Sequence, residues 1–398
     1  MPTRRGVAVL LGGLVGVVLG AVFGLPEATA LGAGAIALVG AAVLTVQLRG
    51  RAPAVRRTVR PPRVAVGDPC EVVLTVGNDG SRRTPPARLV DEVAGEATAR
   101  FLVAPLAPGE QASSTYELAT SRRGAYRIGP LHARVGGPFG LARLDEQRDG
   151  TSTVVVLPRV VPLPPLPAAV GDEPELGTRS MVAVSTVDEE FTGLRGYVPG
   201  DDVRRIHWPS SARAGDALVR QFEVPWQRRT TLVVDLRADH HDPWSFERTV
   251  TAAASVVALA AAGSELLRLG TDEQPDPPFV SAAEHLDAIL DRFALLAPVP
   301  AGAGSHGLIA AVERATASAT GRLVVCTGAP NPGELDAVLR AASRAGTALV
   351  VTTAGEGPSR PTISAGGAVH VHWDGRSDLA AAWRDAGEAL RAPGVGSR

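Results

Sequence analysis

The chain has 398 residues and a formal net charge of −1, so it can hold two or three domains but lacks the broad basic field of many nucleic-acid-binding proteins. Its 40 Lys+Arg residues are all arginine. This excludes a Walker-type phosphate loop and Schiff-base chemistry, because both need lysine. Cys70 and Cys326 have spacing typical of neither a disulfide framework nor a metal site.

Two uncharged apolar runs, 6–25 and 29–48, begin the chain and are each about as long as a bilayer core requires. Residues 1–57 are therefore predicted to form a transmembrane helical hairpin followed by a basic juxtamembrane segment. A cleaved signal peptide is the alternative, because Ala28-Thr29-Ala30 resembles a cleavage site. The first run exceeds the usual apolar region of about 7–15 residues, which favours the uncleaved hairpin.

Small residues recur at four-residue spacing in both runs and predict the helix–helix contact. The predicted stripes are Gly12, Gly16, Gly20 and Gly24 in the first run, and Ala33, Ala37 and Ala41 in the second.

The placement of arginine predicts the orientation of this hairpin. Arg4 and Arg5 precede the first run, and six arginines follow the second: Arg49, Arg51, Arg56, Arg57, Arg60 and Arg63. The turn between the runs carries only Glu27. The positive-inside rule therefore predicts a two-pass protein of the cell membrane, with both ends and the soluble body in the cytoplasm.

From residue 58 to 163 the sequence changes to short alternating strands separated by turn signals such as Asn78-Asp79-Gly80. This spacing predicts an all-β, immunoglobulin-like sandwich. A proline-rich linker is predicted at 164–187. From 230 to 392 strands and helices alternate, which predicts an α/β, doubly wound domain with a mostly parallel sheet.

Residues 188–229 differ from all other parts of the chain. Between Phe191 and Glu223 this segment carries nine charged residues and four aromatic ones, although only 4% of the chain is aromatic. We expect a strand over 191–197, a turn at 199–201, a short helix over 203–208 capped by Asp201 or Asp202, and a returning strand over 217–222. In this arrangement Arg195 and Glu223 would lie near each other.

The segment also resembles a known family. The residues Leu194-Arg195-Gly196-Tyr197-Val198-Pro199-Gly200-Asp201, then Arg204-Arg205-Ile206-His207-Trp208, then Ser211-Ala212-Arg213, are similar to the signature of the bacterial family called "domain of unknown function 58". Residues Arg123 to Pro130 and Pro138-Phe139-Gly140-Leu141 add to the resemblance, although Gly137 stands where a typical member has Asp. The resemblance implies a membrane-anchored chain with a von Willebrand factor A-like domain.

We predict that the signature residues form a partly buried ion-pair network rather than a catalytic site. Its predicted members are Arg195, Tyr197, Gly200, Asp201, Arg204, His207, Trp208, Arg213 and Glu223. A partner-binding or catalytic surface is the alternative for the same residues. His207, Ser210, Ser211 and Asp201 could be assembled into a hydrolase triad, but neither serine lies in a motif typical of a nucleophile.

The A-like resemblance raises the question of a metal. Metal-binding A domains carry Asp-x-Ser-x-Ser at the end of the first strand, and oxygen ligands of this kind suit Mg²⁺. Here Asp235 keeps the first position, but Arg237 and Asp239 replace the two serines, and Ser305 stands where a later threonine is usual. Because Arg237 brings a positive charge to the site, we expect no cofactor. Weak Mg²⁺ binding through Asp235, Asp239 and Ser305 is the alternative.

Further ligand clusters are not expected. The adjacent His240 and His241 are not predicted to share one ion, and His370 and His372 alternate along a strand.

The sequence favours a non-enzymatic scaffold or accessory protein. What the resemblance implies is a role beside a MoxR-type AAA+ ATPase, and with a membrane protein that has a transglutaminase-like domain, in assembling or remodelling other proteins. A metal-dependent ligand-binding A domain is the alternative, and a hydrolase is a third reading. We expect no catalytic residue and no nucleic-acid partner.

Overall fold

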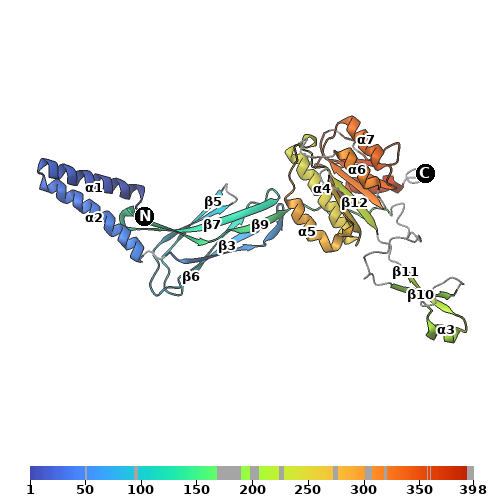
Figure 1. Ribbon diagram of the computed structural model, residues 1–398, viewed down its shortest axis with the longest axis horizontal. Coiled ribbons are helices and arrows are strands. Elements are labelled where there is room, and N and C mark those ends of the chain that lie inside the picture. Colours follow the sequence, from blue (N-terminus) through green and yellow to red (C-terminus); the bar gives the residue numbers. More distant parts are fainter. Residues whose placement is uncertain are drawn as a thin grey trace. The chain divides into compact units, whose positions relative to one another are not determined.

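The computed structural model describes residues 1–49, 52–93, 97–167, 190–197, 206–223, 228–271, 277–300, 307–317, 321–355, 357–358 and 360–391. The chain divides into two compact units, Met1–Pro158 and Arg159–Arg398. Each unit is described separately below, and Figure 1 labels their elements.

The first unit begins with two helices, α1 (Arg4–Phe23) and α2 (Pro26–Arg49). Both are long and apolar enough to cross a membrane by length and composition. The chain reverses between them at Gly24, which takes the left-handed conformation (φ 67°) that ends many helices, and Pro26 begins α2. The predicted helical hairpin is therefore present, and it is compatible with membrane anchoring.

The helix–helix contact was predicted in part: Gly16 and Gly20 lie against α2, whereas the other predicted residues do not. Gly6, Gly13 and Gly20 are buried on α1, and a Cβ atom on Gly13 or Gly20 would collide with α2. Gly12 instead faces open space, and Ala33, Ala37 and Ala41 are exposed. The glycines of α1 at the contact with α2 are thus Gly13, Gly16 and Gly20, whose spacings of three and four residues place them on one helix face.

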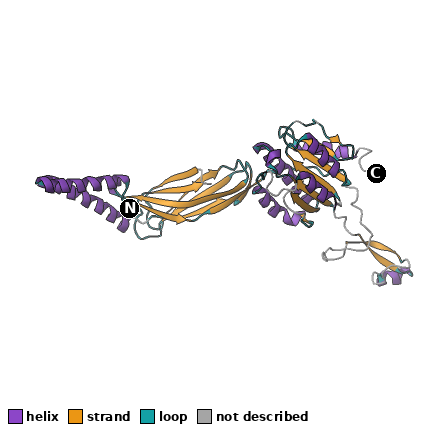
Figure 2. Ribbon diagram, turned by 45° about the horizontal axis from the view of Figure 1, so that its top comes forward, coloured by secondary structure: helices purple, strands orange, loops and turns teal. Residues whose placement is uncertain are grey.

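The β domain of this unit consists of two sheets with a shared core (Figure 2). One sheet has the order β1-β3-β6, from β1 (Ala54–Arg60), β3 (Cys70–Gly77) and β6 (Gln111–Leu118). The other has the order β2-β9-β7-β4-β5, and β8 pairs with β7. Its strands are β2 (Arg63–Ala65), β4 (Ala87–Val93), β5 (Ala97–Val103), β7 (Gly124–Gly136), β8 (Arg143–Asp149) and β9 (Ser152–Leu157). A short 3₁₀ turn, η1 (Pro138–Gly140), connects β7 to β8.

Alternation along the strands builds the core between the sheets. In β3, Cys70, Val72, Leu74 and Val76 are all buried, while Glu71 between them is exposed. These side chains meet apolar residues of β4, β7 and β9 in one cluster. The prediction of a β domain is confirmed in this coarse form.

The predicted boundary at residue 58 was wrong, because the segment 54–60 is strand β1 rather than a basic tail. Arg57 is buried and donates a hydrogen bond to the buried Asp91 at 2.7 Å. Asp91 also accepts a hydrogen bond from the Tyr116 hydroxyl at 2.8 Å. Burial raises the pKa of Asp91, against the lowering by Tyr116 and Arg57. Arg57 therefore belongs to the domain core and not to the membrane-facing charges.

The second unit begins with an extended segment that the prediction assigned to a linker. Leu166 is buried, the Trp383 indole donates to the Pro164 carbonyl at 3.2 Å, and Arg322 donates to the Pro167 carbonyl at 3.0 Å. Residues 164–167 thus pack on the α/β domain, and the rest of the predicted linker, 168–187, lies outside the described residues.

The α/β domain has one sheet with the strand order β14-β13-β12-β15-β16-β18-β17. The five central strands are parallel, and the short edge strands β14 and β17 run antiparallel. The strands are β12 (Arg229–Val234), β13 (Leu266–Thr271), β14 (Val280–Ser281), β15 (Arg322–Thr327), β16 (Thr347–Thr352), β17 (Thr362–Ile363) and β18 (Val369–His372).

Helices lie on both faces of this sheet (Figure 2). They are α4 (Pro243–Ala262), α5 (Ala282–Ala294), α6 (Leu308–Ala317), α7 (Pro332–Ala342) and α8 (Leu379–Arg391). β12, β15 and β16 are buried along almost their whole length, as expected for a sheet that is covered on both sides. The predicted doubly wound α/β domain is therefore confirmed.

Candidate functional site

The sheet order places a switch point between β12 and β15. The chain leaves β12 toward β13 on one side and later returns to β15 on the other side. In open α/β sheets, ligands bind beyond the carboxyl ends of the strands at such a point. Asp235 directly follows β12, Thr327 ends β15, and Thr353 directly follows β16. The candidate site is therefore this strand-end crevice.

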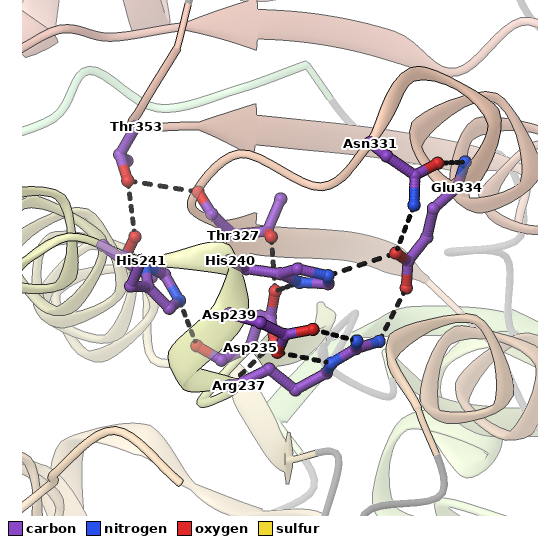
Figure 3. A network of polar contacts seen from close by, with 10 residues as sticks. Asp235, Arg237, Asp239, His240, His241, Thr327, Asn331, Glu334 and Thr353 are labelled. Atoms are coloured by element: carbon purple, nitrogen blue, oxygen red, sulfur yellow. Dashed lines mark hydrogen bonds and ion pairs between the residues drawn. The ribbon is translucent and has the colours of Figure 1, made fainter. Parts of the chain in front are cut away.

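Asp235 lies at the centre of the crevice and is fully buried. Its carboxylate accepts hydrogen bonds from the Thr327 hydroxyl and from Nδ1 of His240, the latter at 2.6 Å. The backbone N–H of Arg237 donates to the other carboxylate oxygen at 3.1 Å. Figure 3 shows these donors converging on Asp235. Both of its oxygens are thus satisfied from within the chain.

His240 bridges two carboxylates. It belongs to the 3₁₀ turn η3 (Ala238–His240), which directs its ring into the crevice. Nδ1 faces Asp235, and Nε2 lies 3.1 Å from an oxygen of Glu334 in the first turn of α7. Burial alone would lower the pKa of His240, but the hydrogen bond to Asp235 and the charges of Asp235 and Glu334 outweigh it and raise the pKa. The geometry favours an imidazolium that donates from both nitrogens.

Arg237 supplies a second internal cation. Its guanidinium binds Glu334 at 2.9 Å and pairs with both oxygens of Asp239. The hydrogen bond from Arg237 lowers the pKa of Asp239, and the same bond raises the pKa of Arg237. Asn331 caps α7 by accepting from the Glu334 N–H at 2.9 Å, which fixes the helix end that carries Glu334.

Two neighbouring residues complete the surroundings of the crevice. His241 turns away from His240 and donates to the Asp235 carbonyl at 2.9 Å, and burial lowers its pKa. The Thr353 hydroxyl donates to the Thr327 carbonyl at 3.1 Å (Figure 3). His240 and His241 therefore point at different groups.

The residues present do not fit a Mg²⁺ site of the A-domain type. Asp235 accepts hydrogen bonds from three donors, and Asp239 is paired with Arg237. The positive charges of Arg237 and His240 already lie beside these carboxylates and would repel a metal ion. Within the described part of the chain, no three His, Cys, Asp or Glu side chains are grouped for a metal. Ser305 lies outside the described residues.

Sequence reasoning identified Asp235, Arg237 and Asp239 but missed His240 and Glu334 as members of the network. The spacing Asp-x-Arg-x-Asp-His directly after a buried strand was the available signal for His240. Glu334 lies 94 residues later, and only its place in the first turn after β15 connects it to the same strand ends.

The signature segment forms a small hairpin. Strands β10 (Glu190–Gly196) and β11 (Leu218–Glu223) pair antiparallel, and helix α3 (Trp208–Ala214) precedes β11. The helix begins at Trp208 rather than ending there as predicted. His207 occupies the N-cap position, where its Nδ1 lies 2.8 Å from the Ser210 hydroxyl. Gly215 ends the helix in the left-handed conformation.

The predicted ion-pair network of this segment is corrected in two places. Arg195 pairs with Val219 while Glu223 pairs with Glu190, so Arg195 and Glu223 lie at opposite ends of the hairpin. Arg213 is exposed rather than partly buried. Tyr197 and Trp208 are exposed as well, at 36% and 68%. Gly200, Asp201 and Arg204 lie outside the described residues, as do the side chains of Arg195 and Glu223.

Comparison with known proteins supports the family. Residues 193–353 match the family model described as "Protein of unknown function DUF58". The match covers less than half of the chain, and this part of the chain is similar to the DUF58 family. It covers most of the signature segment and continues through β16, so it includes Asp235, His240, Glu334 and Thr353. No curated protein matched the chain.

Similarity to solved structures is weak. The CARDB domain of a Pyrococcus furiosus protein is 24% identical, over 26% of this chain and 94% of that domain, with a TM-score of 0.21. A domain of a putative cell surface protein from Methanosarcina acetivorans is 15% identical, over 27% of this chain and 94% of its own, with a TM-score of 0.19. A GH3 β-glucosidase from Bifidobacterium adolescentis is 18% identical, over 28% and 18%, with a TM-score of 0.17. These scores are too low to carry a functional argument.

Proposed function

We propose that the chain is a non-enzymatic, membrane-anchored scaffold or accessory protein that acts with a MoxR-type AAA+ ATPase in assembling or remodelling other proteins. A membrane protein with a transglutaminase-like domain is a second proposed partner. The identity of both partners rests on the family resemblance.

One observation supports a binding role over a catalytic one most strongly. The strand-end crevice, where ligands usually bind in this class of fold, is occupied by the chain's own Arg237 and His240, which neutralise Asp235, Asp239 and Glu334. A carboxylate that acts as general acid or base must lie within hydrogen-bond reach of the substrate proton that it moves. The Asp235 carboxylate is instead bonded to three donors, which suits a rigid structural centre.

The proposal also includes a named fold for each domain and an orientation in the membrane. We interpret the α/β domain as von Willebrand factor A-like, because six strands run in the order β14-β13-β12-β15-β16-β18 with a short antiparallel β14 at the edge. We interpret the β domain as immunoglobulin-like from its two facing sheets. Both helices would span the membrane with the β domain and the second unit on the cytoplasmic side, because exposed Arg4, Arg5 and Arg56 lie at that end of the hairpin.

A reporter fused after Arg398 checks this orientation. We expect cytosolic reporter activity in whole cells. Activity of the fusion on the outer side of the membrane would contradict the orientation while leaving the anchoring intact.

The signature hairpin is the proposed docking element for the ATPase. Trp208, Tyr197 and Arg213 are exposed on it, and Trp, Tyr and Arg are the residues most enriched among energetic hot spots of protein interfaces. A tryptophan at the first position of a short helix, with 68% of its surface in water, contributes little to folding.

The test compares two exposed tryptophans. Trp208→Ala should weaken ATPase binding by about 30-fold or more, since hot-spot truncations cost at least ~2 kcal/mol, while thermal melting stays as in the wild type. Trp244→Ala is the matched control, because Trp244 is 72% exposed at the start of α4. Equal binding by both variants would contradict the docking role, and a lower melting temperature for Trp208→Ala would indicate a structural role instead.

The hydrolase reading depends on the 2.8 Å contact between His207 and Ser210. The two residues are three positions apart at the start of one short helix, so their contact is a local one between neighbouring side chains. Hydrolysis of ester or peptide probes that is abolished by Ser210→Ala would overturn the non-enzymatic proposal.

A further inference from the structure

The loop between β7 and β8 is built onto the base of the helical hairpin. The first three residues of the chain are hydrogen-bonded to it: Thr3 N–H donates to the Leu141 carbonyl at 2.9 Å, and Arg143 N–H donates to the Met1 carbonyl at 2.8 Å. Pro2 and Ala142 form an antiparallel bridge between these two bonds. In Figure 1 the N-terminus lies at this end of the β domain. The loop is therefore fixed to the residues that lead directly into α1.

Close packing sets the level of this loop along the two helices. Gly6 on α1 lies so close to the Leu141 carbonyl that a Cβ atom would collide with it, and the same holds for Gly137 against the Val46 side chain on α2. Leu141 and Ala142 are buried in one cluster with Val46. Gly6 is two residues from the start of α1 and Val46 is three from the end of α2. At about 1.5 Å per residue, the loop meets both helices within their terminal turns.

Phe139 projects from this loop in an unusual way. Its φ of 57° is in the left-handed region, which is unfavourable for a bulky residue. Its side chain is 78% exposed, whereas Leu141, two residues later, is 5% exposed. Packing within the first unit thus explains Leu141 but leaves the ring of Phe139 in water. A residue held in a strained conformation without a packing role points to a function at that position.

We propose that Phe139 inserts into the lipid interface of the leaflet where α1 begins and α2 ends, so that this loop is a third membrane-contacting element beside the two helices. The proposal rests on the membrane anchoring of the proposed function. Leu141 and Ala142 of the loop share one buried apolar cluster with Val46 of α2, and aromatic side chains are favoured where headgroups meet acyl chains. Arg4, Arg5 and Arg143 are exposed around the same pairing and favour anionic lipid.

The contact would hold the β domain at the membrane surface. β7 runs for 13 residues from Gly124 to Gly136, so its far end lies about 40 Å from the loop at roughly 3.3 Å per residue. Phe139 and the far end of β7 should therefore report two different environments in the same molecule.

The experiment uses the full chain in liposomes of mixed anionic and zwitterionic lipids. An environment-sensitive fluorophore is attached at Phe139→Cys, at Ser121→Cys near the far end of β7, and at Leu14→Cys on the exposed surface of α1. The native Cys70 and Cys326 are buried, so they add little labelling in the folded protein. Quenching is measured with nitroxide-labelled lipids and with iodide in the water.

We expect the label at 139 to be quenched by lipid nitroxides at least threefold more than the label at 121, and to be protected from iodide. Equal quenching at 139 and 121, with the label at 14 quenched by lipid, would overturn this proposal alone. An unquenched label at 14 would overturn the membrane anchoring itself. Shielding of the label at 139 only after the ATPase is added would show that a protein, and not lipid, covers the loop, and would also overturn the proposal.

A second variant separates lipid contact from folding. Phe139→Gly removes the ring and suits the left-handed backbone, so the variant should fold as well as the wild type. In anionic liposomes we expect hydrogen exchange in the 137–143 loop to be faster for this variant than for the wild type. In nanodiscs that lack anionic lipid we expect no such difference. An unchanged exchange rate in anionic liposomes would contradict a role for the ring.

Discussion

Replacing Asp235 with alanine is expected to destabilise the second unit severely. The buried carboxylate accepts from the Thr327 hydroxyl, from His240 at 2.6 Å and from the Arg237 backbone at 3.1 Å. Removing one member of a buried charged pair costs about 3–5 kcal/mol, because the other member stays buried without its partner. Against a domain stability of about 5–15 kcal/mol, the loss is a large fraction.

Intrinsic fluorescence measures this effect in the full chain. All five tryptophans lie between residues 159 and 398, so urea unfolding followed by tryptophan emission reports the second unit without the first. Asp239→Ala is the matched control, because Asp239 pairs with Arg237 from a side chain that is 44% exposed. Exposed pairs contribute about 0–1 kcal/mol. We therefore expect a large shift of the midpoint for Asp235→Ala and a small one for Asp239→Ala.

Two results would refute this reasoning. The first is a free energy of unfolding for Asp235→Ala within about 1 kcal/mol of the wild type. A buried carboxylate that accepts three hydrogen bonds cannot be removed at so small a cost. The second is a midpoint that Mg²⁺ raises in the wild type and not in Asp235→Ala. That outcome would make Asp235 a metal ligand and favour the metal-dependent A-domain alternative.

Three further predictions concern charge. The pKa of His240 is raised above its unfolded value of about 6.5, so its contribution to stability is fully present below pH 6.5 and is lost as pH rises through the folded pKa. The difference in unfolding free energy between wild type and His240→Gln should therefore shrink above pH 6.5. A difference that stays constant with pH would contradict the bridge that His240 forms between Asp235 and Glu334. Asp91→Ala should destabilise the β domain by about 3–5 kcal/mol, because it leaves the buried Arg57 without its partner. Hydrogen exchange in β4 measures this loss. Asp145→Ala, which breaks a partly exposed pair with Arg134, should change the exchange little. The free energy of unfolding of Arg213→Ala should lie within about 0.5 kcal/mol of the wild type, because the Arg213 side chain is exposed. A marked loss of stability would instead support the predicted ion-pair network of the signature segment.

The sequence predicted the architecture where apolar patterns were long. The two helices, the parallel strands and the helices between them follow from apolar runs that few other structures accommodate. Strand β1 was assigned to the basic segment because AVRRTVR carries too many charges to show alternation, and RLDEQRD of β8 is similarly charged. β8 pairs only with β7 at the side of its sheet, where one face can remain polar. The contact between α1 and α2 was predicted in part, since Gly16 and Gly20 lie at it, whereas Gly12 and the predicted alanines do not.

Only part of the candidate site could be predicted from the sequence. Asp235 was identified because it follows a buried strand, but its partners depend on how η3 and the first turn of α7 approach that strand end. A local pattern cannot show that His240 turns inward while His241 turns away. In the signature segment the reverse happened, since mixed charges and aromatics predicted burial, whereas Arg213 and Trp208 are exposed.

Retention of the ATPase on the full chain tests the central claim most directly. The tagged protein is reconstituted in nanodiscs and incubated with the MoxR-type ATPase of the same organism, with ATP, with ADP and without nucleotide. The account predicts a stable complex in at least one nucleotide state, no chemical change of either protein, and loss of the complex with Trp208→Ala but not with Trp244→Ala. No complex in any nucleotide state would contradict the account.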